Sequence, residues 1–234
     1  VHIYLIIVVL PLMLISETRA GGEVLFREDF NRLDQWETLT FPDIEAHTVY
    51  TIQHGADSGV LQVVSRNSAS ALVYKHRYDI TAYPVLHWRW KVANLYARGD
   101  YRRKSGDDYP LRVFLFFPYE PDKAGLGTRM KYALARTLYG HYPPHNCLNY
   151  IWANRGDETG RVLSPYTDRA VMIPVQQGRA NLGQWMEEEV NVLADYRRAF
   201  GTDPPPGATL AIMGDADDTG EQATAYLDFI EVRR

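Results

Sequence analysis

Alternation of apolar and polar residues predicts a chain built mainly from β-strands. In segment 86–92, Leu86, Trp88, Trp90 and Val92 would share one strand face, with charged or polar residues on the other. A helix would scatter these four apolar side chains around its axis. Further short apolar, β-branched or aromatic runs recur, several of them separated by turn residues: 48–52, 60–64, 71–74, 111–117, 148–154, 170–175, 210–214 and 225–232. Strands at this spacing predict an all-β fold, a two-sheet antiparallel β-sandwich of the jelly-roll type.

Two segments depart from this alternation and indicate short helical insertions. Between 128 and 139, apolar residues recur at helical spacing, and Gly140 and the prolines after it would end the helix. The pattern also allows a helix over 192–200, followed by Gly201 and the Pro204–Pro206 run.

The first twenty residues are predicted to be a signal peptide. The apolar run 3–15 would span about 20 Å as a helix, less than the roughly 30 Å of a bilayer core. It is followed by Thr18 and Ala20, which suit cleavage after Ala20. An uncleaved anchor or a buried apolar segment are the alternatives. We therefore expect residues 21–234 to form one exported domain, periplasmic or extracellular, with no stable membrane span after cleavage.

Composition and charge exclude several classes of protein. Of the 234 residues, 46% are hydrophobic and 23% are charged, as in a folded globular protein. The net charge is −4, whereas a dedicated nucleic-acid-binding protein carries an excess of basic residues, so that class is excluded. A single cysteine, Cys147, excludes an internal disulfide and a cysteine-based metal cluster within one chain. The sequence also lacks a nucleophile elbow, an HExxH motif and a P-loop.

An acidic loop at 215–220 offers oxygen ligands for a cation. Asp215, Asp217 and Thr219 alternate before Gly220, which matches the first half of a calcium-binding loop. The twelfth position is Tyr226 rather than Glu, so the loop is not an EF-hand. A structural calcium site, a sugar-contacting loop and a solvated turn are the three interpretations.

A second acidic pair lies just before a predicted strand. Asp107 and Asp108 precede Arg112, and carboxylates there would ligate a cation, accept hydrogen bonds from sugar hydroxyls or serve as general acid and base. Neighbouring side chains on a strand point in opposite directions, so the two would cooperate only if a turn redirects them. Solvation, or an ion pair with a nearby basic residue, is the alternative.

An aromatic and amide face is predicted on segment 149–154. Tyr150, Trp152 and Asn154 would share one side of a strand, where rings stack on a sugar and an amide binds its hydroxyls. The alternative is that the rings belong to the core.

A charged strand face is predicted near residue 187. Glu187 and Glu189 would lie opposite His87 and Arg89 across a sheet, as a polar-ligand groove or a solvated outer face.

Four stretches together resemble the bacterial domain of unknown function 3047 family. They are 86–92 (LHWRWKV), 106–113 (GDDYPLRV), 148–152 (LNYIW), and 195–201 (DYRRAFG) with 213–219 (MGDADDT). The resemblance covers about 25–232. It implies a family but no function, because none is recorded in the family's name.

A looser resemblance links the two ends of the domain to jelly-roll carbohydrate-binding modules. Segments 25–30 and 225–232 are similar to the first and last strands of such modules. A structural calcium ion often joins these ends in the modules, which implies Glu28 or Asp29, together with Asp228, as ligands. The analogy concerns the fold, and function depends on sites.

The leading hypothesis is a non-catalytic binding protein for a polar ligand, with a glycan favoured. Tyr150 and Trp152 would stack on the sugar, and polar side chains would bind it: Asp107, Asp108, Arg112, Asn154, Asp195 and Asp215. One alternative is a polysaccharide hydrolase or lyase that uses carboxylates such as Asp107 or Glu189. Another is a structural or assembly protein of the envelope.

Overall fold

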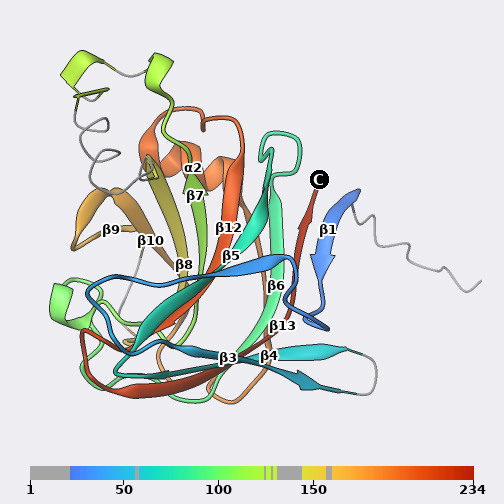
Figure 1. Cartoon of the computed structure of the whole chain (residues 1–234), viewed down its shortest axis with the longest axis vertical. Helices are drawn as coiled ribbons and strands as arrows, with labels where there is room; N and C mark the ends of the chain where they lie inside the picture. The colour runs from blue at the N-terminus through green and yellow to red at the C-terminus, as the bar shows by residue number, and fades with distance from the viewer. Residues whose placement is uncertain (1–21, 56–57, 124, 128, 131–143, 157–159) are drawn as a thin grey trace, which may run out of the picture.

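The protein folds as a β-sandwich of two sheets (Figure 1). The structure is a computed structural model, and it describes residues 22–55, 58–123, 125–127, 129–130, 144–156 and 160–234. The predicted signal peptide lies outside the described residues. In the part of the chain that is described, no helix is both long and apolar enough to cross a membrane.

The first sheet has six strands, in the order β11-β6-β13-β4-β3 with β1 beside β13. Their bounds are β1 Val24–Glu28, β3 Val49–His54, β4 Gly59–Arg66, β6 Val85–Val92, β11 Met186–Asn191 and β13 Gln222–Arg233. The strand predicted over 86–92 is confirmed as β6, in which every second side chain is buried. The first and last strands are neighbours, with Phe26 opposite Val232.

The second sheet has seven strands, in the order β2-β5-β12-β7-β8-β10-β9. Their bounds are β2 Trp36–Leu39, β5 Ala69–Tyr78, β7 Arg112–Phe117, β8 Asn146–Ala153, β9 Val162–Ser164, β10 Thr167–Gln177 and β12 Ala208–Asp215. Its described strand pairs are antiparallel except β8 and β10, which are parallel. These two sheets confirm the predicted all-β sandwich of the jelly-roll type.

One predicted helix is confirmed, as α2 (Val192–Phe200). Asn191 caps its first turn, because the side-chain oxygen of Asn191 accepts from Ala194 N at 2.8 Å. Gly201 ends the helix with φ of 70°, which is the left-handed conformation that glycine adopts without strain. Most of the helix predicted over 128–139 lies outside the described residues. Two short 3₁₀ turns, Lys104–Gly106 and Pro121–Lys123, flank β7.

The main core lies between the sheets and is rich in aromatic rings. Trp88 and Trp90 of β6 are fully buried, as predicted, and they face Tyr150 and Trp152 of β8 across the sandwich. Each facing pair has its ring centroids 5.6 Å apart. The opposite faces of β5, β7, β8 and β12 therefore point away from this core, and they carry the candidate site.

Candidate functional site

A groove of about 1500 Å³ runs over the outer face of the second sheet. Its floor follows from strand register. One row crosses the sheet from β5 to β10 through Val73, Ala211, Phe114, Asn149 and Met172. Since side chains alternate along a strand, neighbouring rows two residues away face the same groove.

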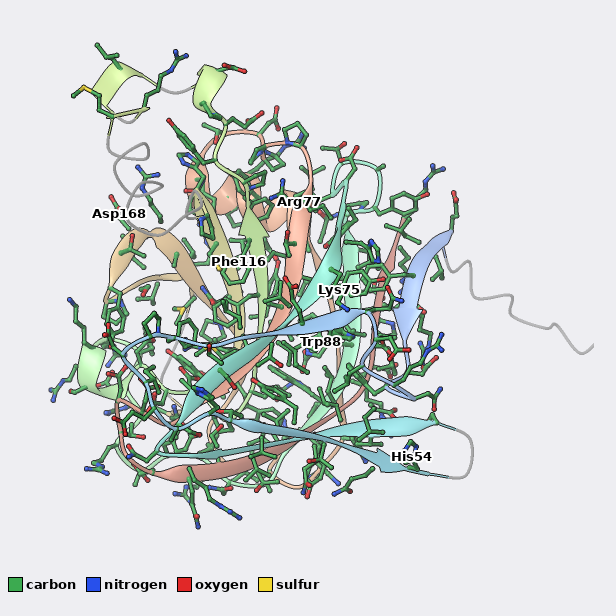
Figure 2. The ribbon with its side chains drawn as sticks, viewed as in Figure 1. His54, Lys75, Arg77, Trp88, Phe116 and Asp168 are labelled. Atoms are coloured by element: carbon green, nitrogen blue, oxygen red, sulfur yellow. The ribbon has the colours of Figure 1, made fainter. Side chains whose placement is uncertain are left out.

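The neighbouring floor rows give the groove two different ends. Toward one end, a row holds Arg77, Thr209, Phe116 and Cys147. Figure 2 labels Arg77, Phe116 and two other lining residues, Lys75 and Asp168. Toward the other end, rows hold Ala71, Met213 and Arg112, and then Asp215. We call this second end the acidic end, because Asp107, Asp217 and Asp218 also line it.

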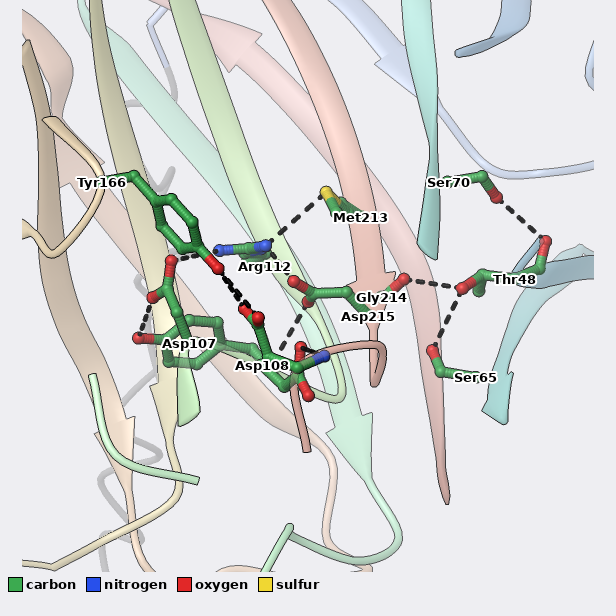
Figure 3. Close-up of polar contacts among 12 residues, drawn as sticks. Thr48, Ser65, Ser70, Asp107, Asp108, Arg112, Tyr166, Met213, Gly214 and Asp215 are labelled. Atoms are coloured by element: carbon green, nitrogen blue, oxygen red, sulfur yellow. Dashed lines mark hydrogen bonds and ion pairs between the residues drawn. The ribbon is translucent and has the colours of Figure 1, made fainter. Parts of the chain in front are cut away.

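Arg112 is the only described cation among the buried residues of the acidic end (Figure 3). Its guanidinium pairs with the carboxylate of Asp215, and Nη1 lies 3.9 Å from Asp107 Oδ2. The hydroxyl of Tyr109 donates to Asp107 Oδ1 at 3.0 Å, and the Tyr109 backbone N–H donates to Asp215 Oδ1 at 3.1 Å. All four side chains are buried, which makes their charges interact more strongly than they would in water.

A turn separates the two adjacent acids. Asp107 follows the 3₁₀ turn at Lys104–Gly106 and lines the groove. Asp108 points instead to the loop after β12, where it accepts from the N–H groups of Asp218 at 3.3 Å and Thr219 at 2.6 Å. Asn154 holds this turn in place, since its Nδ2 donates to Asp108 O at 2.7 Å and its Oδ1 accepts from Tyr96 N at 3.0 Å. Asp108 and Asn154 are thus placed to support the site, and neither is among the residues that line the groove.

Burial shifts the acid–base equilibria at the acidic end. It raises the pKa of Asp107 from 3.8 to about 6, and Arg112 only partly offsets the effect. Burial also raises the pKa of Asp215 well above its usual value, and the pKa values of Asp217 and Asp218 are raised for the same main reason. Negative charges outnumber the guanidinium here, so the groove end favours protonated carboxyls.

Three of these acids could share a metal ion. Ligand atoms of Asp108, Asp215 and Asp217 lie within 4.8 Å of one another. Calcium prefers six to eight oxygens, however, and here Asp215 already pairs with Arg112. The hydroxyl of Thr219 accepts from Glu221 N at 3.4 Å. The described residues therefore do not assemble a calcium coordination shell, and calcium binding by this loop stays a prediction.

The other expected calcium ligands have separate partners. Glu28 accepts from Phe30 N at 2.8 Å and from Trp36 Nε1 at 3.0 Å. Asp228 pairs with Arg89 at 3.1 Å. The two ends of the domain are joined by β1–β13 backbone pairing, and the predicted Glu28 and Asp228 site is not assembled in the described part of the chain.

The sequence over residues 34–231 matches the family described as protein of unknown function (DUF3047). The chain belongs to the DUF3047 family. This confirms the resemblance carried by segments 86–92, 106–113, 148–152, and 195–201 with 213–219. No curated protein matches the chain.

Several solved structures are similar to this DUF3047 chain at low sequence identity. A family 11 carbohydrate-binding module from Clostridium thermocellum, in complex with a mixed-linked tetrasaccharide, has a TM-score of 0.45 and 11% identity, covering 91% of this chain and 95% of the module. Endoglucanase 3 of family GH12 from Trichoderma harzianum has a TM-score of 0.41 and 8% identity, covering 88% and 96%. A cellulase derived from Cel12A of Rhodothermus marinus has a TM-score of 0.39 and 13% identity, covering 85% and 96%.

The expectation that Tyr150 and Trp152 form a sugar platform is wrong. Both rings are fully buried between the sheets of the DUF3047 domain, so neither has a face open to a ligand. Tyr150 donates to Asp195 Oδ2 at 3.1 Å, and Trp152 Nε1 donates to Gly178 O at 3.2 Å. Asp195 lies on α2, where it also pairs with Arg198, and it is not among the groove residues.

The predicted charged strand face is confirmed, but on the other sheet. Glu187 lies opposite Arg89 and Glu189 opposite His87 in the β11–β6 pair. Glu189 pairs with Arg233 and lines no part of the groove, so it cannot act across the groove from Asp107.

Sequence reasoning missed several groove residues of the DUF3047 chain. Asn149 belongs to the face of β8 opposite Tyr150 and lines the groove. The alternation that grouped Tyr150 with Trp152 also predicts that Asn149 lies on the opposite face of the strand. The same alternation in β7 places Phe114 and Phe116 on the face opposite the core-facing Leu115 between them. Tyr166, in the turn between β9 and β10, carried no pattern that could have indicated its position.

Proposed function

We propose that the groove binds a glycan and that the protein is an exported, non-catalytic glycan-binding protein. The observation that carries this proposal is one groove that joins an apolar floor to a cluster of polar groups. Sugar rings have an apolar C–H face and a rim of hydroxyls, so they need both kinds of surface. Export rests on the apolar segment 3–15.

The floor supports this proposal through its shape. Phe114 and Phe116 stack with centroids 5.3 Å apart and planes 13° from parallel. Ala69, Ala71 and Ala211 around them are small, which leaves space above the sheet. A flat apolar strip of this kind suits an extended chain of rings better than a compact charged ligand.

Unpaired polar atoms in the floor give further support. Asn149 Oδ1 and Arg112 Nε are buried and have no hydrogen-bond partner among the described residues. Buried polar groups are normally paired, so each such atom needs an explanation. One is an acceptor and the other a donor, and a sugar hydroxyl can serve both roles.

The test is calorimetric binding of neutral β-glucan, xylan and mannan oligosaccharides to the full chain. We expect at least one to bind, and Phe116→Ala to weaken that binding about tenfold, which corresponds to about 1.4 kcal/mol. Tyr226→Ala is the matched control, because Tyr226 is a partly buried ring in the first sheet with no place in the groove. No binding by the wild type, or equal losses in both variants, would overturn the proposal.

A second candidate function is hydrolysis of the bound glycan, which the position of Asp107 favours. Asp107 lines the groove beside Asp217 and Asp218, and its pKa of about 6 lets it hold a proton near neutral pH. Protonated Asp107 would donate to the leaving glycosidic oxygen. A neighbouring carboxylate would take a proton from the water that attacks the anomeric carbon.

The release of new reducing ends from the same neutral glycans tests this second candidate. Asp107→Asn should abolish release while calorimetric binding persists. If the wild type binds a glycan and releases no reducing ends, hydrolysis is excluded for it and the binding proposal stands.

A further inference from the structure

We propose that Tyr166 is a stacking platform for one sugar ring at the acidic end of the groove. This inference rests on the proposed glycan binding and names a residue and a ligand class for one subsite. The class is a neutral sugar ring, bound by its C–H face.

The exposure of Tyr166 sets it apart from the other rings. Of the Phe, Tyr and Trp side chains that the structure describes, Tyr166 is the only exposed one, with an exposed fraction of 53%. The remaining described rings are buried or partly buried. An aromatic ring open to solvent at the edge of a groove is the surface that Tyr150 and Trp152 cannot supply.

Polar contacts fix the orientation of this exposed ring. The Tyr166 hydroxyl lies 2.8 Å and 2.7 Å from the two carboxylate oxygens of Asp218, and 3.3 Å from the carbonyl oxygen of Lys104. Residues 104, 166 and 218 belong to three separate loops, which meet at this end of the second sheet. A ring that is already held loses little conformational freedom when a ligand stacks on it.

The surroundings of the ring select the ligand. Tyr166 lies over the acidic end near Asp107 and Arg112 (Figure 3), and it lines the groove with Asp217 and Asp218. A ring stacked on Tyr166 would bring its hydroxyls within reach of carboxylate acceptors. The buried guanidinium of Arg112 is already paired with Asp107 and Asp215, and the exposed ammonium of Lys104 lies 5.2 Å from the centroid of the Tyr166 ring. Carboxyl groups outnumber the cations that could pair with a uronic acid, so the subsite favours neutral sugars.

The alternative is that Tyr166 only ties its loop to Asp218. Tyr166→Phe separates the two roles, because it removes the hydroxyl and keeps the ring. Tyr166→Ala removes both, and Tyr166→Trp supplies a different stacking ring.

The experiment is calorimetry of these three variants with the neutral oligosaccharides above and an oligogalacturonate as the anionic member. We expect Tyr166→Ala to weaken neutral-glycan binding about tenfold or more, and Tyr166→Phe and Tyr166→Trp to retain most of it. We also expect the oligogalacturonate to bind the wild type more weakly than the neutral glycans. Melting temperatures establish that each variant is folded, and if Tyr166→Ala unfolds, the Phe and Trp variants still carry the test.

The outcomes separate this inference from the proposed function. If Tyr166→Ala binds as tightly as the wild type while Phe116→Ala binds more weakly, the platform is wrong and the groove proposal stands. If Tyr166→Phe loses as much affinity as Tyr166→Ala, the hydroxyl link and not the ring is responsible, and the platform is again overturned. If the wild type binds none of the glycans, the proposed function fails, and the platform fails with it.

Discussion

At the residue scale, Arg112 organises the acidic end of the groove. It is buried beside the rings of Tyr109 and Phe114, with its guanidinium carbon 5.0 Å from each centroid. A buried cation must be paired, and Asp107 and Asp215 provide the pairing. One guanidinium cannot neutralise all the surrounding carboxylates, so the excess charge is relieved by proton uptake. The site therefore lowers the stability of the folded state near neutral pH.

The pH dependence of Asp107→Asn tests this reasoning. The pKa of Asp107 rises from 3.8 to about 6 on folding, so the folded state binds more protons than the unfolded state between these values. The stability that protonated Asp107 provides is complete below about pH 4 and is lost as pH rises through about 6. Removing the charge should raise the free energy of unfolding at pH 7 by about 2–3 kcal/mol, with little difference at pH 4.

Urea unfolding at the two pH values measures this difference. Asp203→Asn is the control, because Asp203 is an exposed acid paired with Arg197 at the surface. A variant Asp107→Asn that is less stable than the wild type at pH 7 would contradict the prediction. It would mean that the favourable ion pair between Asp107 and Arg112 contributes more free energy than burial of the Asp107 charge costs.

At the scale of elements, alternation predicted which residues share a strand face but not which face meets the core. In β8, Tyr150 and Trp152 were correctly placed together. Cys147 and Ile151 on the opposite face are also apolar and buried. When both faces of a strand are apolar and buried, its residue pattern does not indicate which face points into the core. The pattern in β6 was decisive because one of its faces is charged.

The meeting of distant acids also lay beyond local pattern. Asp107, Arg112 and Asp215 were predicted to bind one ligand, and they do lie together, although ligand binding itself stays a prediction. They meet because β12 lies beside β7 in the second sheet, about a hundred residues further along the chain. Strand order of this kind is set by packing of the whole sheet. Tyr166 and Asp218 lie in two different loops, and their contact likewise depends on the packing of the whole sheet.

The loop that carries Asp108 depends on close packing at Gly99. A Cβ atom at this position would overlap the side-chain amide of Asn154, which holds Asp108 and Tyr96. Gly99→Ala should therefore lower the free energy of unfolding by about 1–3 kcal/mol and weaken glycan binding. Thermal unfolding and calorimetry measure the two effects.

Gly156→Ala provides the comparison, because a Cβ atom there meets no atom of the described residues within 4 Å. Its stability and binding should equal those of the wild type. Unchanged glycan binding in a destabilised Gly99→Ala protein would show that the turn at Asp108 does not position the groove acids.

At the scale of the whole molecule, the core and the groove are two faces of the same strands. β7, β8 and β12 turn one set of side chains toward the first sheet and the alternate set into the groove. The shape of the groove floor therefore follows from how the two sheets pack. Trp152 is central to that packing, because it meets Trp90 of the opposite sheet at a centroid distance of 5.6 Å.

Trp152→Ala should destabilise both sheets together. Removing this fully buried ring should lower the free energy of unfolding by about 3–5 kcal/mol. Urea unfolding should keep a single transition, with the same midpoint by far-UV circular dichroism and by fluorescence. Trp185→Ala is the control, because Trp185 is only partly buried and lies against Lys91 and Tyr226 of the first sheet. It should cost less than about 1 kcal/mol. If Trp152→Ala left stability unchanged and abolished glycan binding, Trp152 would be a ligand platform, and the assignment of both the core and the groove would have to be exchanged.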